Sequence, residues 1–375
     1  AYVDDSTLLS CRPVAAAWKE RLFEVYDLIG DRDELIALEK EKPFALAAKA
    51  LGVEVDFGAE EMRCPESRLA AGLEQLEALV GRSYCKWEEL SSLVGSLGFA
   101  ARTMPRCART MLARLYKAVG RRKARRPGEK CGRHPRFVRL SRGLQVDMQW
   151  WLSCFRVFNG VSMCLEDLWS AAEDMGHCAT DASLAGFGAI FITPDGPQYL
   201  QGKWEDFGID VSLFGTKPCG EDDDLRFHTT ELEMLAIAIA LVTWSKHLAQ
   251  KKLVLATDNS GAERTLNVGR AADAGTMVSM REVARAMCVD SFDVRGVHID
   301  TKANVAADAL SRDDEETFFA FVEEKHGFAR EELTRVESKL DVAAMLQKIR
   351  RARRAAFRSK APVAGDGRHD DAGEL

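Results

Sequence analysis

The order of strands and helices over residues 176–313 constrains the fold of this chain more than any other sequence feature. Apolar runs and period-two alternation predict strands there, and apolar positions at helical spacing predict helices between them. Strands are expected at 178–183, 189–192, 198–201, 253–256 and 292–299, and helices at 231–247, 276–287 and 304–311. Three strands, a helix, a strand, a helix, a strand and a last helix indicate an α/β or α+β layer fold.

The rest of the chain divides into four segments of different texture. Residues 1–60 contain a helical stretch at 12–28 and an alternating strand at 51–57, and residues 61–120 have helical periodicity. Residues 121–175 combine a basic linker containing Pro and Gly with a short helix at 145–155. Residues 314–375 predict two amphipathic helices and a disordered tail. A total of 375 residues favours two or three domains.

Charge is strongly segregated along the sequence. The net charge is −6, yet residues 102–142 hold fifteen Lys and Arg against one acid, Glu129, and a second basic block spans 348–360. The densest run comprises Arg121, Arg122, Lys123, Arg125 and Arg126. Such a stretch favours a polyanion, in particular a nucleic-acid backbone, as partner. A solvated linker and a nuclear-localisation signal are the alternatives.

The composition also excludes some classes of protein. The longest largely apolar run, residues 234–244, is too short for a bilayer crossing, which needs about 20 residues, so no membrane partner is expected. The ten cysteines are scattered singly and form no CxxC pair, which indicates reduced thiols rather than a zinc site or a disulfide framework. We therefore expect an intracellular protein of the cytoplasm or nucleus.

Four acids lie at or near the ends of the elements expected in residues 176–313. Asp181 lies in the first strand and Glu233 in the first turns of the long helix, while Asp258 closes the fourth strand. The fourth acid, Asp308, lies in the last helix. Singly, each has a simpler explanation, such as a helix cap for Asp258 or a surface acid for Asp308.

Together the four acids predict a metal site. If the fold brings them into one cleft, their repulsion calls for divalent cations, and oxygen ligands suit Mg²⁺. Two ions would support the attack of water on a phosphodiester.

Five short segments of residues 176–313 form a series with a known counterpart. They are Thr180–Ser183 with Gly186 and Gly188, Leu232–Ala236, Thr257–Asn259, Val297–Ile299 and Ala307–Arg312. In this order they resemble a type 1 ribonuclease H domain of the form found in retroelement polyproteins. The resemblance implies an α/β, ribonuclease H-like mixed five-stranded sheet with flanking helices. It also implies that Asp181, Glu233, Asp258 and Asp308 hold two Mg²⁺ ions, with Mn²⁺ as a substitute, and that His298 assists catalysis.

Two of these assignments have alternatives. Glu231 competes with Glu233 for the second acid, and we prefer Glu233 because the family pattern Glu-(Leu/Met)-x-Ala fits residues 233–236. His298 lies ten residues before Asp308, as the family's loop histidine does, but a structural histidine is the alternative.

A second series of motifs precedes the first. It comprises Tyr2-Val3-Asp4-Asp5, Lys40 and Lys42 followed by Leu51-Gly52-Val53, the segment Leu93–Ala100, and Trp150-Trp151 leading to Phe158-Asn159-Gly160. These resemble the reverse transcriptase of tyrosine-recombinase (DIRS-like) retrotransposons. The resemblance assigns 1–60 to the C-terminal part of the palm, 61–120 to a helical thumb, 121–175 to a basic linker and connection, and 314–375 to a helical extension with its tail.

The palm motif implies that Asp4 and Asp5 bind catalytic Mg²⁺. A polymerase palm needs a third Asp on an earlier strand, so we expect that an N-terminal polymerase segment of the parent polyprotein is missing. Reverse transcriptase activity is therefore not expected of this chain.

The expected function is that of a metal-dependent endonuclease that cleaves the RNA strand of RNA–DNA hybrids, as the C-terminal fragment of a retrotransposon reverse transcriptase. Contacts to ribose 2′-hydroxyls would discriminate against DNA. One alternative is a catalytically inactive or co-opted nucleic-acid-binding remnant. Another is a DDE-type integrase or transposase, although a Glu placed before the second Asp fits ribonuclease H order better.

Overall fold

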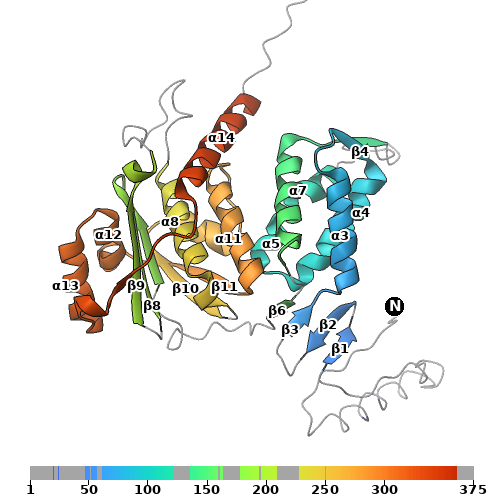
Figure 1. Cartoon of the computed structure of the whole chain (residues 1–375). Coiled ribbons are helices and arrows are strands. Elements are labelled where there is room, and N and C mark those ends of the chain that lie inside the picture. The colour runs from blue at the N-terminus through green and yellow to red at the C-terminus, as the bar shows by residue number, and fades with distance from the viewer. Residues whose placement is uncertain are drawn as a thin grey trace, which may run out of the picture.

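A six-stranded mixed sheet organises the C-terminal half of the protein (Figure 1). The structure is a computed structural model that describes residues 20, 24, 47–50, 52–56, 61–120, 136–158, 161–163, 178–193, 196–208, 228–249 and 251–360. The strand order is β11-β10-β7-β8-β9-β12. The bounds are β7 Cys178–Ala182, β8 Gly186–Thr193, β9 Gly196–Lys203, β10 Lys252–Thr257, β11 Asp293–His298 and β12 Thr334–Arg335. Strands β7, β8 and β9 are antiparallel, whereas β10 is parallel to both β7 and β11.

The expectation of five strands in this sheet is wrong by one. The five expected strands are present, and the C-terminal extension adds β12, which pairs in parallel with β9 through Gln198 and Tyr199. A strand of two residues is too short to produce a periodic pattern in the sequence. It covers part of the edge of β9, where unpaired backbone groups would otherwise invite pairing with other chains.

Helices cover both faces of the sheet (Figure 1). Helices α8 (Thr229–Thr243) and α11 (Thr276–Asp290) lie on one face, and α12 (Val305–Ser311) and α13 (Glu315–His326) lie on the other. Strand β8 contributes Phe187, Ala189 and Phe191 to the core beneath α8, and Ile190 to the core that contains Phe318 of α13. Burial on both faces explains why β8 is a continuous apolar run rather than an alternating one.

Three further helices complete the sheet part, which we define as residues 178–360. They are α9 (Ser245–Leu248), α10 (Ser260–Val268) and α14 (Val342–Lys360). The single helix expected at 231–247 is therefore two, since α8 ends before Trp244 and α9 follows it. No helix in the described residues is long and apolar enough to cross a membrane.

A helical part, residues 66–158, packs beside the sheet part (Figure 1). Its helices are α3 Glu66–Leu79, α4 Trp87–Ala100, α5 Arg106–Thr110, α6 Ala113–Val119 and α7 Arg142–Phe155. Five strands in this part of the chain, β1, β3, β4, β5 and β6, were not expected. Strands β4 (Tyr84–Lys86) and β5 (Phe137–Arg139) pair with each other, and β3 (Glu61–Arg63) lies between β2 (Val53–Asp56) and β6 (Val161–Met163), with β1 (Ala47–Ala50) beyond β2.

Several sequence expectations lie outside the described residues. They include the palm motif with Asp4 and Asp5, and the basic run with Arg121, Arg122, Lys123, Arg125 and Arg126. The helix expected at 12–28 is described only at Glu20 and Glu24, both of which are helical.

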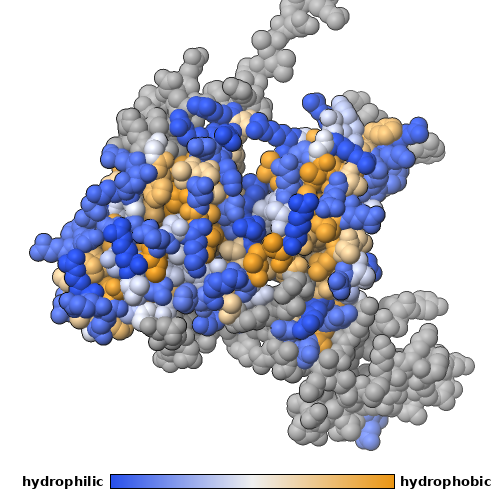
Figure 2. Space-filling view, in the orientation of Figure 1, coloured by the Kyte–Doolittle hydropathy of each residue, from blue (hydrophilic) through white to orange (hydrophobic). Residues whose placement is uncertain are grey.

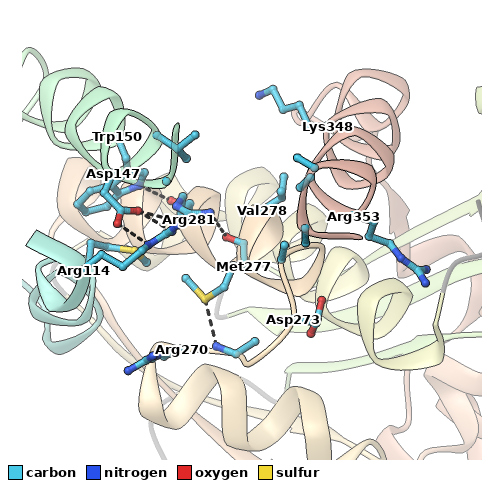
Figure 3. A pocket seen from close by; sticks show the side chains of 18 of the residues that line it. Arg114, Asp147, Trp150, Arg270, Asp273, Met277, Val278, Arg281, Lys348 and Arg353 are labelled. Atoms are coloured by element: carbon cyan, nitrogen blue, oxygen red, sulfur yellow. Dashed lines mark hydrogen bonds and ion pairs between the residues drawn. The ribbon is translucent and has the colours of Figure 1, made fainter. Parts of the chain in front are cut away.

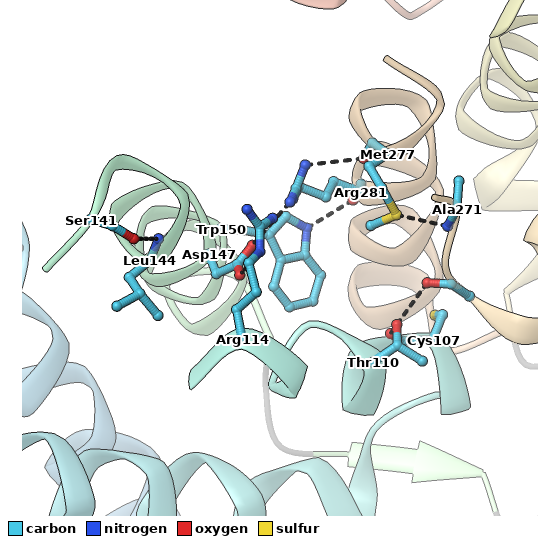
Figure 4. Close-up of polar contacts among 11 residues, drawn as sticks. Cys107, Thr110, Arg114, Ser141, Leu144, Asp147, Trp150, Ala271, Met277 and Arg281 are labelled. Carbon is cyan, nitrogen blue, oxygen red and sulfur yellow. Dashed lines mark hydrogen bonds and ion pairs between the residues drawn. The ribbon is translucent and has the colours of Figure 1, made fainter. Parts of the chain in front are cut away.

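The helical part and the sheet part share one hydrophobic core and also leave a hollow between them, visible in the space-filling view (Figure 2). Beside the hollow, the carboxylate of Asp147 on α7 binds two guanidiniums (Figure 3). Arg281 of α11 approaches it to 2.9 Å and Arg114 of α6 to 2.7 Å. The indole Nε1 of Trp150 donates to the carbonyl of Arg281 at 2.8 Å, and Thr110 donates to the carbonyl of Gly269 at 2.7 Å (Figure 4).

Desolvation dominates the Asp147–Arg281 pair. Asp147 is buried and Arg281 is largely buried, with 3% and 12% of their side-chain surfaces exposed. Burial raises the pKa of the Asp147 carboxyl despite its two cationic partners, and burial lowers the pKa of Arg281 despite its carboxylate. Such a pair contributes little net stability, but removing one partner leaves the other charge buried and uncompensated.

We therefore predict that Asp147→Ala lowers the free energy of unfolding by about 3 kcal/mol, measured by urea denaturation. Replacing both partners with apolar residues, as Asp147→Leu with Arg281→Met, should recover most of that loss. Arg156→Ala serves as the control, because Arg156 forms a half-exposed ion pair with Glu77, and it should cost about 0.5 kcal/mol. A double variant as unstable as Asp147→Ala would contradict the prediction.

Candidate metal centre

Three carboxylates converge near the carboxyl-terminal ends of the parallel strands β7 and β10. One oxygen each of Asp181, Glu233 and Asp258 lie within 4.8 Å of one another. The sheet register explains part of this convergence. Strands β7 and β10 are parallel and pair Ala179 with Ala256, so residues two positions further along both strands, 181 and 258, reach the same level. Helix α8 packs against β7 and brings Glu233 to them.

Asp258 is free to take part because another residue caps the next helix. The sequence allowed Asp258 to be the N-cap of the helix that follows, but the N-cap of α10 is Asn259. Its side-chain oxygen accepts a hydrogen bond from the backbone N–H of Ala262 at 2.9 Å. The half-buried carboxylate of Asp258 therefore has no capping role and lies beside Asp181 and Glu233.

Helix geometry separates the two candidate glutamates. Residues two positions apart on an α-helix point in directions about 200° apart. Glu233 therefore faces Asp181, whereas Glu231 binds Arg353 of α14 at 3.0 Å. Glu231 also accepts a hydrogen bond from the backbone N–H of His228 at 2.9 Å. Of the two glutamates, Glu233 is the one that belongs to the carboxylate cluster.

The fourth acid, Asp308, lies next to the cluster rather than within it. Its carboxylate forms a two-pronged ion pair with Arg312, one turn later on the chain, at 2.7–2.9 Å. Its charge still acts on the cluster, because it raises the pKa values of Asp181 and Glu233.

Helix α12 connects Asp308 to the cluster through a close approach to the sheet. A side chain at Gly188 would collide with the carbonyl of Ala307 and with Leu310, so glycine lets α12 lie directly on β8. The hydroxyl of Ser311 can then donate to Oδ2 of Asp181 at 2.5 Å. The amide of Asn304 also donates to the carbonyl of Thr180 at 3.0 Å.

The sequence motifs gave no role to Ser311, Arg312 or Asn304. The signal was present, because residues three or four positions apart share a face of a helix. Asp308, Ser311 and Arg312 have this spacing, and Asn304 precedes Asp308 by four residues.

His298 lies beside the cluster. It is the last residue of β11, opposite Thr257 of β10, and its side chain is exposed. Its ring Nε2 lies 3.1 Å from the carbonyl oxygen of Asp258 and donates to it in the tautomer that carries a proton there. The histidine is therefore close to the second aspartate while remaining open to solvent.

Burial and mutual repulsion shift the acids of the cluster. Burial raises the pKa of Glu233 to about 9, helped by the charges of Asp181 and Asp258. Burial also raises the pKa of Asp181 to about 6, although the hydroxyl of Ser311 opposes the shift. Without a cation, part of the cluster is therefore protonated at neutral pH.

The donor set fits a hard divalent cation. Oxygen Oε2 of Glu233 is buried and has no hydrogen-bond partner among the described residues. A bound cation would satisfy an orphaned oxygen on a carboxylate that lies beside two other carboxylates. Oxygen-only ligands favour Mg²⁺ or Mn²⁺ over zinc or copper. The three carboxylates can hold such an ion.

Comparison with known proteins adds little. No protein-family model and no curated protein matches the sequence. The structure of a foamy viral protease-reverse transcriptase in complex with dsDNA is similar at 12% identity and a TM-score of 0.30, over 78% of this chain and 53% of that one. A dRH form of that protein with dsDNA is similar at 12% identity and a TM-score of 0.29, over 78% of this chain and 44% of that one. The chain thus spans about half the length of these proteins, and TM-scores this low do not establish a common fold.

The shifted acids predict how the stability of the metal-free protein depends on pH. In the unfolded chain both acids ionise near their usual values, whereas the folded chain keeps their protons up to about pH 6 and about pH 9. The folded state therefore binds more protons between about pH 4 and about pH 9, and its stability falls as the pH rises through that window.

Accordingly, Glu233→Gln should raise the Tm in EDTA at pH 9 by at least about 2 °C, and Mg²⁺ should raise the Tm of the unsubstituted protein at the same pH. Thermal unfolding monitored by circular dichroism measures both effects. Glu324→Gln, an exposed acid on α13, should change neither. Equal Tm values for the Glu233→Gln variant and the unsubstituted protein at pH 9 would contradict the repulsive cluster.

Proposed function

We propose that this protein is a metal-dependent endonuclease of ribonuclease H type, which cleaves the RNA strand of RNA–DNA hybrids. The observation that carries the proposal is the convergence of Asp181, Glu233 and Asp258 from three separate elements, with a buried oxygen of Glu233 left unsatisfied. The order of elements supports it, since three antiparallel strands precede the helix with Glu233 and the parallel strand that ends at Asp258. This is the order that the sequence resemblance implies.

The ligands would be Asp181, Glu233 and Asp258, with Asp308 as a neighbouring acid. When bound, divalent cations would supply charge neutralisation and activation of water for phosphodiester hydrolysis. The chain's own residues would prepare the site. The hydroxyl of Ser311 orients the carboxylate of Asp181, and the half-buried Asp258 leaves the cluster open on one side.

Asp308 and His298 would act at the border of the cluster. The ion pair with Arg312 holds Asp308 back from the three central acids. Arg312, whose side chain is 60% exposed, would also hold a substrate phosphate, and Asp308 would then be free to serve as a further ligand. The exposed ring of His298, beside Asp258, would assist proton transfer or the release of product.

The wider assignment is also a proposal. We infer that the chain corresponds to part of a retroelement reverse transcriptase of the DIRS-like type, with residues 61–120 as the thumb and residues 121–175 as the basic linker and connection. Asp4 and Asp5 would then belong to the palm, and Arg121, Arg122, Lys123, Arg125 and Arg126 would contact the nucleic-acid backbone. These assignments rest on the sequence motifs.

Substitution within the cluster tests the proposal most directly. Asp258→Asn and Glu233→Gln should each lower Mg²⁺-dependent cleavage of a labelled RNA–DNA hybrid by at least about 100-fold, because each removes a charged ligand. Glu231→Gln should keep cleavage within about 10-fold, because Glu231 faces α14 instead of the cluster.

The pair of neighbouring glutamates provides an internal control. Both substitutions lie in the first turns of α8, so a general loss of folding would affect both variants. Cleavage that survives in Asp258→Asn would remove the metal assignment. Tight hybrid binding without Mg²⁺-dependent cleavage by the unsubstituted protein would instead identify a nucleic-acid-binding remnant.

His298→Ala should reduce the rate of cleavage by about 100-fold, the lower end of what a general acid or base contributes. Because the side chain is exposed, the Tm should change little. Single-turnover and steady-state rates of the same variant would separate proton transfer from product release. A variant as fast as the unsubstituted protein in both regimes would make His298 a structural residue.

A further inference from the structure

A groove of about 1220 Å³ lies between the helical part and the sheet part (Figure 3). Helices α6 and α7 form one wall, and α11 and α14 form the other. The loop at 270–274 lines it, and so do His228 and Glu231 at the start of α8. At Glu231 the groove thus comes within two residues, along the sequence, of Glu233, a member of the carboxylate cluster.

Each acid that lines this groove already has a cationic partner or a backbone N–H donor. Asp147 is paired with Arg114 and Arg281, and Glu231 is paired with Arg353. Glu282 is paired with Lys348 at 3.3 Å, and the carboxylate of Asp273 accepts the backbone N–H of Thr276 at 2.7 Å. The lining acids therefore leave little negative charge to repel an anion.

Three lining cations remain without a carboxylate partner among the described residues. They are Arg142 at the start of α7, Arg270 in the loop after α10, and Arg351 on α14, and all three side chains are exposed. They come from three elements that are distant in the sequence but face one hollow. The lining also includes uncharged side chains, among them Val146, Met277 and Val278.

We propose that this groove binds the phosphodiester backbone of one strand of a nucleic acid, held by Arg142, Arg270 and Arg351. Guanidiniums match phosphate geometry and remain charged at any physiological pH. Cations on separate elements match a series of phosphates better than they match a single small anion. The uncharged residues of the lining suit the sugars between the phosphates. The proposal rests on the proposed nuclease function for its choice of substrate, an RNA–DNA hybrid that would continue from the carboxylate cluster into the groove.

This proposal gives the C-terminal basic helix a function. Helix α14 follows the elements that form the carboxylate cluster, and its basic block had no explanation in the sequence. Arg353 fixes α14 to Glu231 of α8, and Lys348 fixes it to Glu282 of α11. Two of its cations therefore anchor the helix, and Arg351, between them in sequence, is left to face the groove.

The test is hybrid binding in EDTA, so that cleavage does not contribute. Fluorescence anisotropy with a labelled RNA–DNA hybrid should give a Kd about 10-fold weaker for Arg142→Ala/Arg270→Ala/Arg351→Ala than for the unsubstituted full chain. The slope of log K against log salt should decrease by about one for each cation removed. Arg351→Glu alone should weaken binding in the same direction and serves if the triple variant is unstable.

Lys325→Ala is the matched control, because Lys325 is an exposed cation on α13, away from the groove. Its Kd and salt slope should equal those of the unsubstituted protein. If the Arg351→Glu and triple variants bind as tightly as Lys325→Ala, the groove proposal is overturned, whatever the cleavage assay shows. Stronger binding of decaglutamate than of the hybrid, lost in the triple variant, would also overturn it in favour of an acidic peptide.

The outcomes separate this inference from the proposed nuclease activity. Groove-dependent binding without cleavage supports the inference and rejects the nuclease. Cleavage by the unsubstituted protein, with binding unaffected in the groove variants, supports the nuclease and rejects the inference.

Discussion

Repulsion among Asp181, Glu233 and Asp258 is the interaction on which the proposed function depends. At about 4 Å and an effective dielectric constant near 20, two like charges repel by about 4 kcal/mol. The elements that hold these acids cannot move apart to relieve it, because β7 and β10 are paired in the sheet and nearly every residue of α8 is buried. The folded chain must therefore keep protons on the cluster or bind cations there. Because the rigid core holds the three acids close together, the cluster gains affinity for cations.

Helix α8 links this cluster to the C-terminal extension. Its inward face carries Glu233, and its opposite face carries Glu231, which Arg353 of α14 and the backbone of His228 hold. A rotation of α8 that withdrew Glu233 from the cluster would break the Glu231 contacts. The buried carboxylate of Glu231 would then lack the guanidinium of Arg353. The extension is therefore structural as well as basic. Its strand β12 covers the sheet edge, and its helix α14 fixes the orientation of α8.

Periodicity located the five long strands and most helices of residues 178–326, because each carries an apolar pattern of its own. The acids could be identified from the sequence, but their convergence depends on the β7–β10 register, which no local pattern contains. Three-residue strands such as β3, β4 and β5 carry too few residues for a pattern. The choice of Asn259 over Asp258 as helix cap was open in the sequence, since both residue types cap well. Asp147 resembled an ordinary helix acid, because its partner Arg281 lies 134 residues away.

The ion pair between Asp147 and Arg281 also fixes how the two walls of the groove lie relative to each other. The two walls belong to different parts of the chain, and between α7 and α11 the contacts include one ion pair and one indole hydrogen bond. Sliding one wall against the other would leave the largely buried guanidinium of Arg281 without its carboxylate, while Asp147 would keep only Arg114, at a cost far above that of an apolar contact. The pair contributes little to the stability of the protein but allows only one relative position of α7 and α11. The spacing between Arg142 on α7 and Arg351 on α14 is therefore fixed before a ligand binds. A nucleic-acid strand whose phosphates match this spacing binds without an entropic cost for ordering the groove walls.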